Sequence, residues 1–175
     1  MEKKPLILIV DDEVGVLNAL ERLLKLDGYE IRRAQDPLEA LEILKQEPID
    51  LIISDHLMPG MKGLDLLKEA KNIRPDAIRI ILTGHADLAL AMKAINEGEV
   101  YRFFTKPWDD EELRLDVKLA IEKLMLEREN KKLKKELSEK EKALKELEAK
   151  FPGITQVKRD ARGAIIIDDE DLEGE

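Results

Sequence analysis

Residues 6–12 of the chain read Leu-Ile-Leu-Ile-Val-Asp-Asp, five aliphatic residues followed at once by two acids. A short, unbroken aliphatic run that ends in polar residues indicates a buried β-strand. Apolar residues at helical spacing come next, at Val14, Leu17, Leu20 and Leu24. Asp27-Gly28 then indicates the end of this helix. The chain therefore begins with a buried strand that leads into a helix through an acidic turn.

The alternation of strand and helix continues to about residue 108. Further strands are predicted at 29–34, 49–54, 77–82 and 100–105, and further helices at 36–44, 64–70 and 86–96. Asp36 followed by Pro37 is typical of a helix N-terminus. The first of these strands is more polar than the others and is predicted to lie at a sheet edge. Aliphatic strands joined by helices predict an α/β fold, a doubly wound five-stranded parallel sheet covered on both faces.

The composition limits the function classes that the chain can belong to. Charged residues make up 39% of the chain, against roughly 25% in an ordinary globular domain, which predicts a charged, extended segment beside a globular one. The net charge of −9 disfavours a DNA-binding surface, which would need a basic stripe. The chain has no cysteine, which excludes disulfides, zinc–thiolate sites and cysteine nucleophiles. No apolar run approaches the roughly 18 residues of a membrane span, so we expect a cytoplasmic protein without DNA or membrane contacts.

Polar residues follow the predicted strands at the ends where parallel sheets bind ligands. They are Asp11, Asp12, Asp55, Thr83, Gly84 and Lys106. Three carboxylates in one place repel one another, and Mg²⁺, which prefers oxygen ligands, would relieve that repulsion. A carboxylate held there can attack phosphorus and form an aspartyl phosphate. The ammonium of Lys106 can neutralise phosphoryl oxygens, Thr83 can donate a hydrogen bond to one of them, and Gly84 leaves room for the group to approach.

Simpler interpretations of the same residues exist. Asp11 and Asp12 also suit a helix N-terminus, where acids interact favourably with the helix dipole. Thr83 is typical of a helix start, and Lys106 taken alone could be an ordinary solvated surface lysine. The positions of Asp55 and Lys106 at other strand ends favour a common site over these interpretations.

Four separated motifs fall at these strand ends. They are Asp11-Asp12, Asp55 with Met58-Pro59-Gly60 and Gly63, Thr83-Gly84, and Lys106-Pro107. Together they resemble the motif set of the receiver domain of two-component response regulators, over about residues 5–120. The resemblance implies the flavodoxin-like strand order 2-1-3-4-5. It also implies that Asp55 accepts a phosphoryl group from a phosphohistidine on a sensor histidine kinase.

The resemblance further implies a metal set and a switch. The Mg²⁺ ligands would be Asp11, Asp12, Asp55 and the main-chain carbonyl of Leu57, with Asp12 as a direct ligand and Asp11 acting through water. On phosphorylation Thr83 would move toward the phosphate and Phe103 would turn inward. Phe103 has no hydroxyl to donate, so packing alone would hold that state.

The resemblance also bears on the lifetime of the phosphoryl group. Receivers shape the attack of water with the residues two positions after the acceptor and two after the threonine, which are Leu57 and His85 here. Leu57 cannot orient a water molecule, so we expect slow autodephosphorylation. His85 could instead aid hydrolysis or a partner phosphatase, or simply begin a helix.

The chain has neither glycine nor proline from Asp109 to Phe151 and is rich in Glu, Lys and Leu there. A helix of this length is longer than a receiver domain, so its second half is expected to extend past the domain. The a positions of a heptad are Lys123, Asn130, Leu137, Leu144 and Phe151, and the d positions are Leu119, Leu126, Leu133, Lys140 and Leu147. We predict a dimer seam through Leu119, Leu126, Asn130, Leu133, Leu137, Leu144 and Leu147.

The polar residues of this heptad are less uniform than the leucines. Asn130 at an a position resembles the residue that sets register in parallel dimers. In a parallel pair Glu129 could contact Lys134 favourably, whereas repulsion is expected for Glu122 with Glu127 and for Glu136 with Glu141. The heptad could also pack back on the receiver instead of pairing.

We therefore predict three parts: a receiver domain at 1–118, an extended coiled-coil helix at 119–151, and a short possible hairpin with an acidic tail at 152–175. The leading hypothesis is a response regulator without a separate catalytic domain that signals through changed homodimer or partner contacts. The alternative is a phosphorelay intermediate that passes the phosphate to a histidine phosphotransfer protein. An aspartyl-nucleophile hydrolase is disfavoured, because Leu57 stands where such enzymes carry a second acid. The sequence leaves open whether an output domain exists outside these residues.

Overall fold

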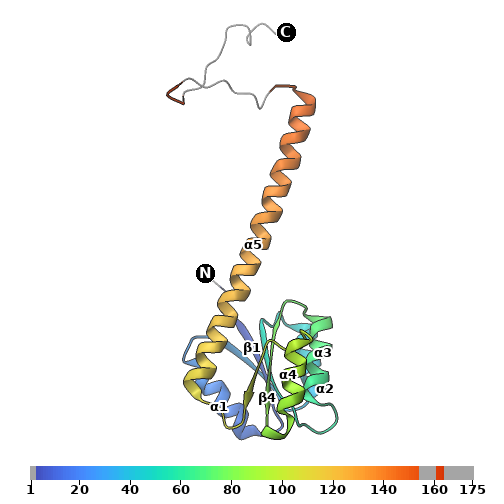
Figure 1. Cartoon of the computed structure of the whole chain (residues 1–175), viewed down its shortest axis with the longest axis vertical. Helices are drawn as coiled ribbons and strands as arrows, with labels where there is room; N and C mark the ends of the chain where they lie inside the picture. Colours follow the sequence, from blue (N-terminus) through green and yellow to red (C-terminus); the bar gives the residue numbers. More distant parts are fainter. Residues whose placement is uncertain (1–2, 154–160, 164–175) are drawn as a thin grey trace. The chain divides into compact units, whose positions relative to one another are not determined.

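The computed structural model describes residues 3–153 and 161–163 of the chain. Strands and helices alternate in this part of the chain (Figure 1). The strands are β1 (Leu6–Val10), β2 (Glu30–Ala34), β3 (Leu51–Asp55), β4 (Ile78–Thr83) and β5 (Arg102–Thr105). The helices are α1 (Val14–Lys25), α2 (Pro37–Gln46), α3 (Gly63–Ile73), the 3₁₀ turn η1 (His85–Asp87), α4 (Leu88–Asn96) and α5 (Asp110–Lys150).

The five strands form one parallel sheet in the order β2-β1-β3-β4-β5, which confirms the predicted doubly wound fold. β1 and β3 are buried at every residue, because each pairs on both edges and is covered on both faces. β2 lies at an edge and keeps partly exposed residues, as its polar sequence predicts. The strand order reverses between β1 and β3, so the carboxyl ends of these strands border the usual ligand position of this fold.

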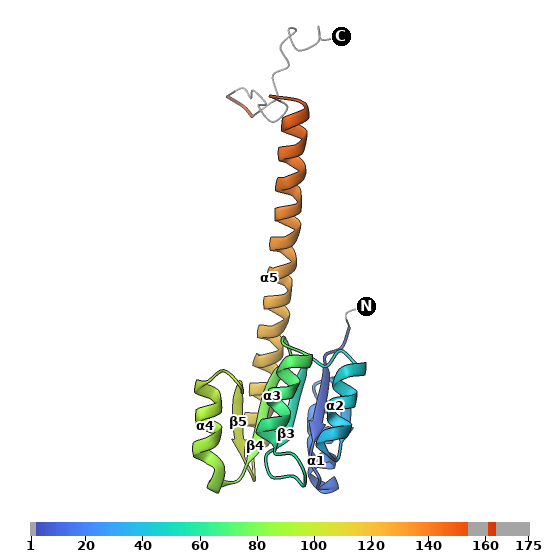
Figure 2. The same cartoon turned by 90° about the vertical axis from the view of Figure 1, so that its right-hand side faces the viewer.

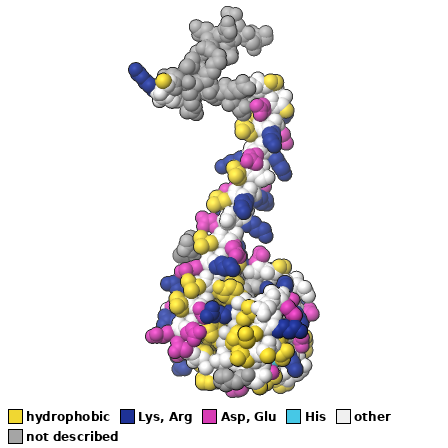
Figure 3. Space-filling view, in the orientation of Figure 1, with side chains coloured by type: hydrophobic (Ala, Val, Ile, Leu, Met, Phe, Trp, Pro, Cys, Tyr) yellow, Lys and Arg dark blue, Asp and Glu magenta, His cyan; other side chains and the backbone are white. Residues whose placement is uncertain are grey.

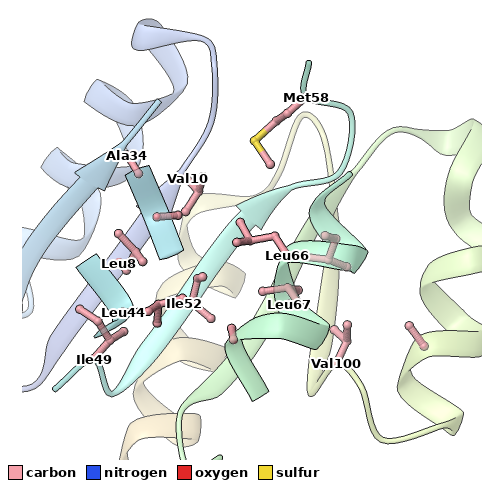
Figure 4. Close-up of a cluster of buried hydrophobic side chains, with 14 of the residues drawn as sticks. Leu8, Val10, Ala34, Leu44, Ile49, Ile52, Met58, Leu66, Leu67 and Val100 are labelled. Carbon is pink, nitrogen blue, oxygen red and sulfur yellow. The ribbon is translucent and has the colours of Figure 1, made fainter. Parts of the chain in front are cut away.

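Two apolar cores lie on opposite faces of the sheet. α2, α3 and α4 cover one face, where Leu8 and Val10 of β1 are buried (Figures 2 and 4). α1 and the start of α5 cover the other face, where Ile7 and Ile9 are buried. Successive side chains of a strand point to opposite faces, so one aliphatic run serves both cores. Fully burying each such side chain contributes roughly 1.5–3 kcal/mol, which makes packing on the sheet the main source of stability for these short helices.

The start of α2 follows the sequence prediction, whereas the start of β3 does not. Asp36 caps α2, and its carboxylate accepts the N–H of Glu39 at 2.9 Å. β3 begins at Leu51 and not at residue 49. The reason is that the buried carboxylate of Asp50 accepts the N–H of Leu6 at 2.8 Å and ties the strand entrance to β1 through a side chain.

α5 continues without interruption for 41 residues. Its first part packs in the second core through Leu113, Val117, Ala120 and Ile121, and Leu124 is buried as well. Every described residue from Leu126 onward is exposed. The chain divides into two compact units, Met1–Leu126 and Glu127–Glu175, and α5 contributes to both.

The hairpin and acidic tail predicted for 152–175 lie outside the described residues, apart from turns at 152–153 and 161–163. Among the helices that the structure describes, none is at once long enough and apolar enough for a membrane span.

Gly63, the first residue of α3, lies against the main chain at the end of β3. Its N–H donates to the carbonyl of His56 at 2.8 Å. A Cβ added to Gly63 would collide with the carbonyl oxygen of Asp55 and would lie 2.8 Å from the Cα of His56. The colliding atoms belong to the main chain, so no side-chain rotation can relieve the overlap. The turn between β3 and α3 therefore requires glycine at this position.

We expect Gly63→Ala to lower the free energy of unfolding by at least about 2 kcal/mol, because the strand end must shift to admit the methyl group. Gly15→Ala is the matched control: its Cβ meets nothing within 4 Å in α1, so the helical preference of alanine should stabilise the chain by about 0.5–1 kcal/mol. Urea unfolding measures both. Equal effects of the two substitutions would contradict the assigned packing at Gly63.

Candidate functional site

The carboxyl ends of β1 and β3 bring three carboxylates together. Asp11 follows β1 and is fully buried, Asp55 ends β3 and is buried, and Asp12 is exposed. Val10 pairs with Ser54 in the ladder, so the residues that follow them, Asp11 and Asp55, lie next to each other. One oxygen of each of the three carboxylates lies within 4.8 Å of the other two. This donor set fits Mg²⁺, a hard cation that is bound by a few carboxylates and keeps several waters.

Lys106, directly after β5, contacts two of these acids. Its ammonium lies 2.8 Å from Oδ2 of Asp11 and 3.1 Å from Oδ1 of Asp55. Burial by itself lowers the pKa of Lys106, but hydrogen bonds and charge interactions with Asp11 and then Asp55 outweigh burial and raise the pKa. Lys106 is therefore a fixed positive charge between the two carboxylates. Its peptide bond to Pro107 is cis.

Burial raises the pKa of Asp55, and the negative charge of Asp11 raises it further. The hydrogen bond and charge of Lys106 and the N–H of His56 oppose this shift without cancelling it. The ionised form of Asp55 is thus disfavoured relative to water. Added positive charge at the cluster would relieve this, which is a second reason why the site suits a divalent cation.

Two short hydrogen bonds hold Asp55 in place, and neither was predicted from the sequence. The N–H of His56 donates to Oδ1 of Asp55 at 2.9 Å, the oxygen that also contacts Lys106. The hydroxyl of Ser54 donates to the carbonyl of Asp55 at 2.8 Å. A serine inside an aliphatic strand is a signal that could have pointed to this role. A main-chain donor such as the His56 N–H leaves no such signal.

Thr83 and Gly84 lie at the same edge of the sheet, at the end of β4. Thr83 is buried, and its hydroxyl donates to the carbonyl of Gly84 at 3.2 Å. The N–H of Lys106 donates to the carbonyl of Thr83 at 2.9 Å, so the main chains of these two residues are joined. The helix predicted from residue 86 starts instead as η1, where the N–H of Asp87 reaches the carbonyl of Gly84 at 3.2 Å.

Leu57 and Phe103 lie in different surroundings. Leu57 lies in the loop between β3 and α3, two residues after Asp55, and is 58% exposed. Phe103 in β5 is partly buried and packs against the core that α2, α3 and α4 cover. An open groove of about 610 Å³ adjoins Phe103 and is also lined by Ile95 of α4 and Glu112 of α5. β5 therefore connects Lys106 to a groove between α4 and α5.

The fold and the site together define a class of protein. A flavodoxin-like sheet whose strand ends carry an acid cluster and a paired lysine is the architecture of phosphorylation-controlled signalling domains. The chain belongs to the response regulator receiver domain family, whose model matches residues 7–118. It is thus a receiver of the two-component type.

Known relatives agree with this assignment. The hydrogenase transcriptional regulatory protein HoxA of Cupriavidus necator is 31% identical over 69% of this chain and 25% of the relative. The chain thus spans about a quarter of the length of the curated relatives it matches first. Sporulation initiation phosphotransferase F of Bacillus subtilis is 36% identical over 64% of this chain and 90% of the relative.

Solved structures show the same fold. The signal receiver domain of an HD domain-containing protein from Pseudomonas fluorescens matches with a TM-score of 0.68 and 43% identity, over 74% of this chain and 95% of that one. An adenylate cyclase structure from Rhodopirellula baltica matches with a TM-score of 0.72 and 35% identity, over 76% and 98%.

We expect Asp55→Asn to raise the melting temperature at pH 7 without Mg²⁺, because it removes a carboxylate whose charge is disfavoured. The raised pKa of Asp55 means that the wild type loses stability as pH rises from the ordinary value of 3.8 through the higher folded-state pKa. The advantage of the variant should therefore shrink as pH falls through the folded-state pKa and vanish below 3.8, where the wild-type carboxyl is protonated in both states. Scanning fluorimetry across this pH range measures the effect.

Millimolar Mg²⁺ should raise the melting temperature of the wild type more than that of Asp55→Asn, because a ligand stabilises the state that binds it. Asp65→Asn, at an exposed acid in the first turn of α3 outside the cluster, should keep the wild-type response. An equal Mg²⁺ response of wild type and Asp55→Asn would contradict a role of Asp55 in the metal site.

Proposed function

We propose that this chain is a response regulator that accepts a phosphoryl group on Asp55 from a sensor histidine kinase. The observation that carries the proposal is the cluster of Asp11, Asp12 and Asp55 within 4.8 Å, with the ammonium of Lys106 on two of its members. A carboxylate next to a fixed cation, at an edge with room for a divalent ion, suits attack on phosphorus. We place the protein in the cytoplasm, where such kinases deliver phosphate.

The transfer exchanges one phosphorus bond for another. An oxygen of Asp55 forms the new P–O bond while the P–N bond of the kinase phosphohistidine breaks, and the electron pair returns to the imidazole. Oδ1 is held by Lys106 and by the His56 N–H, which leaves Oδ2 as the attacking atom. Lys106 then pairs with a phosphoryl oxygen as a point charge. The chain needs no separate catalytic domain for this step or for the slow hydrolysis that follows.

Asp11, Asp12, Asp55 and the main-chain carbonyl of Leu57 would hold Mg²⁺. The bound ion would supply positive charge to phosphoryl oxygens. Asp12 is the exposed member of the cluster, which suits it to contact the ion directly, and buried Asp11 would act through water.

Phosphorylation would reach the surface through Thr83 and Phe103. The phosphoryl group adds nearly two negative charges and three acceptor oxygens, so the hydroxyl of Thr83 would leave the carbonyl of Gly84 to bond one of them. The space that Thr83 vacates would admit the ring of Phe103. The groove at Phe103 touches both α4 and α5, so this movement would alter the packing of α5.

We further propose that the output is a change in homodimer or partner contacts made by α5. The predicted seam leucines Leu119, Leu126, Leu133, Leu137, Leu144 and Leu147 are 46–66% exposed in the chain. Large apolar side chains exposed at heptad spacing favour pairing with another helix. The net charge of −9 favours a protein partner over DNA, although relatives such as HoxA carry the name of transcriptional regulators.

A second candidate function is a phosphorelay intermediate that passes phosphate to a histidine phosphotransfer protein. The likeness to sporulation initiation phosphotransferase F favours it, because this chain covers 90% of that relative. Such a protein needs no dimer, so its mass would stay that of one chain in every phosphorylation state.

We expect beryllofluoride with Mg²⁺, a mimic of the phosphoryl group, to change the mass or elution of the wild type in size-exclusion chromatography with light scattering. Trp108 lines the Phe103 groove and its fluorescence should change as well. Asp55→Ala should show neither response, because the mimic needs the carboxylate. A constant mass of 20.0 kDa with an intact fluorescence response would favour the phosphorelay function. Absence of any response in the wild type would contradict the phosphoacceptor assignment.

Leu57→Asn should shorten the lifetime of the phosphoryl group about tenfold, which corresponds to ~1.4 kcal/mol in the barrier, because an amide can orient water beside Asp55. Radiolabelled protein loaded from a small phosphoryl donor gives the decay rate. Leu38→Asn, at an exposed leucine of α2, is the control and should decay as the wild type does. An unchanged rate in Leu57→Asn would contradict the shielding role of Leu57.

A further inference from the structure

The dimer proposed above can form with its two helices parallel or antiparallel. Hydrophobic side chains recur along α5 between charged ones (Figure 3). Three a and d positions interrupt them with polar residues, namely Lys123, Asn130 and Lys140. The parallel and antiparallel arrangements differ in which residue of the partner subunit lies opposite each of these three polar residues.

In a parallel pair in register, each seam residue meets its own copy. Lys140 would face Lys140 and bring like charges into a partly desolvated interface. Lys123 would face Lys123, with each ammonium near the Tyr101 ring of its own chain. The flanking contacts would be repulsive for Glu122 with Glu127 and for Glu136 with Glu141, and attractive for Glu129 with Lys134. Leucine spacing allows this arrangement, but its charges oppose it.

On the basis of the proposed dimer, we propose that α5 pairs with α5 of a second copy in an antiparallel arrangement centred on residue 135. Asn130 lies five residues before this centre and Lys140 five residues after it, so the two polar positions meet in one layer. The amide oxygen of Asn130 can accept a hydrogen bond from the ammonium of Lys140. The apolar layers are Leu133 with Leu137, Leu126 with Leu144, and Leu119 with Phe151.

Lys123 is the remaining polar seam residue, and it would lie opposite Leu147. Its ammonium lies 5.4 Å from the centre of the Tyr101 ring, within the receiver unit. The charge is therefore directed to an aromatic face while the aliphatic stem of the side chain remains available for packing. Lys123 can thus occupy an apolar layer without meeting a like charge.

The flanking charges also favour the antiparallel direction, in which e positions meet e positions and g positions meet g positions. The attractive contacts are Lys134 with Glu141 and Glu122 with Lys150. The repulsive contacts are Glu127 with Glu148 and Glu136 with its own copy. Twofold symmetry doubles every one of these contacts except that of Glu136 with its own copy. Attractive pairs therefore outnumber repulsive pairs in the antiparallel dimer. In the parallel dimer, repulsive pairs are twice as numerous as attractive pairs.

Other antiparallel registers do not place Asn130 opposite Lys140. A shift of the centre by half a heptad toward the N-terminus would place Lys123 opposite Lys140. A shift of the same size toward the C-terminus would place Asn130 opposite Leu147 and Lys140 opposite Leu137. Among the three registers, only the one centred on residue 135 pairs the two interior polar residues with each other.

The antiparallel arrangement has a consequence for signalling. Leu119 would lie opposite Phe151 of the partner subunit, and Leu119 is adjacent to Ala120 of the receiver core. Each receiver would therefore meet the end of the other subunit's helix. Changes in the packing of α5 within one receiver would reach the second copy directly at this layer.

Spin labels on the full chain test the direction. The chain has no cysteine, so Lys135→Cys, Lys142→Cys and Ala149→Cys each introduce one label site, and all three residues are exposed f positions of the heptad. In the antiparallel dimer the labels of residue 149 lie about 42 Å apart along the axis, those of residue 142 about 21 Å apart, and those of residue 135 level. Pulsed dipolar spectroscopy should therefore give distances that increase from 135 to 149.

Lys135→Cys is the matched control, because its labels lie level in either direction and report pairing alone. A short distance at residue 135 and equally short distances at 142 and 149 would overturn the antiparallel proposal while leaving the dimer in place. No dipolar coupling at any of the three positions would show a monomer and overturn both the dimer and its direction. The Asp55 site is tested separately by its beryllofluoride response.

Discussion

The ion pairs of Lys106 with Asp11 and Asp55 are the interaction on which the geometry of the site depends. Asp11 is fully buried, and a buried carboxylate without a nearby cation is costly. Lys106 lies 95 residues away from Asp11 in sequence, so the charge is compensated only when β1, β3 and β5 have joined one sheet. Charge compensation at this edge therefore requires the complete fold, and an incomplete sheet leaves the acids uncompensated.

β5 joins the proposed phosphoryl site to the proposed output surface. β5 carries Phe103 at the groove between α4 and α5 and ends one residue before Lys106. A change in what Lys106 contacts acts on the end of a strand whose Arg102 pairs with Asp116 of α5 and whose Phe104 packs in the same core as Leu113. The proposed signal thus has a short path: one strand joins the cation at the site to the helix that presents the seam.

The sequence predicts the parts of this molecule that depend on pattern and leaves out those that depend on atomic placement. Continuous aliphatic runs such as 6–10 predict central strands, because only a sheet covered on both faces needs them. The position of Asp55 and Lys106 after separate strands predicts that they converge. The hydrogen bond from His56 to Asp55 and the tie of Asp50 to Leu6 involve main-chain donors, which every residue has, so no pattern marks them. The predicted strand start at residue 49 was wrong for that reason, because the strand begins at Leu51.

The charge balance of the cluster also links the proposed metal to the proposed phosphate. In the structure Lys106 compensates both Asp11 and Asp55. A phosphoryl group on Asp55 would attract the ammonium with nearly two negative charges, so Asp11 would lose part of its compensation. Asp11 and Asp12 would then hold a divalent cation more tightly than before. By thermodynamic reciprocity, the cation must favour the phosphorylated form by the same free energy. We therefore expect a bound divalent cation to favour the phosphorylated state of this receiver.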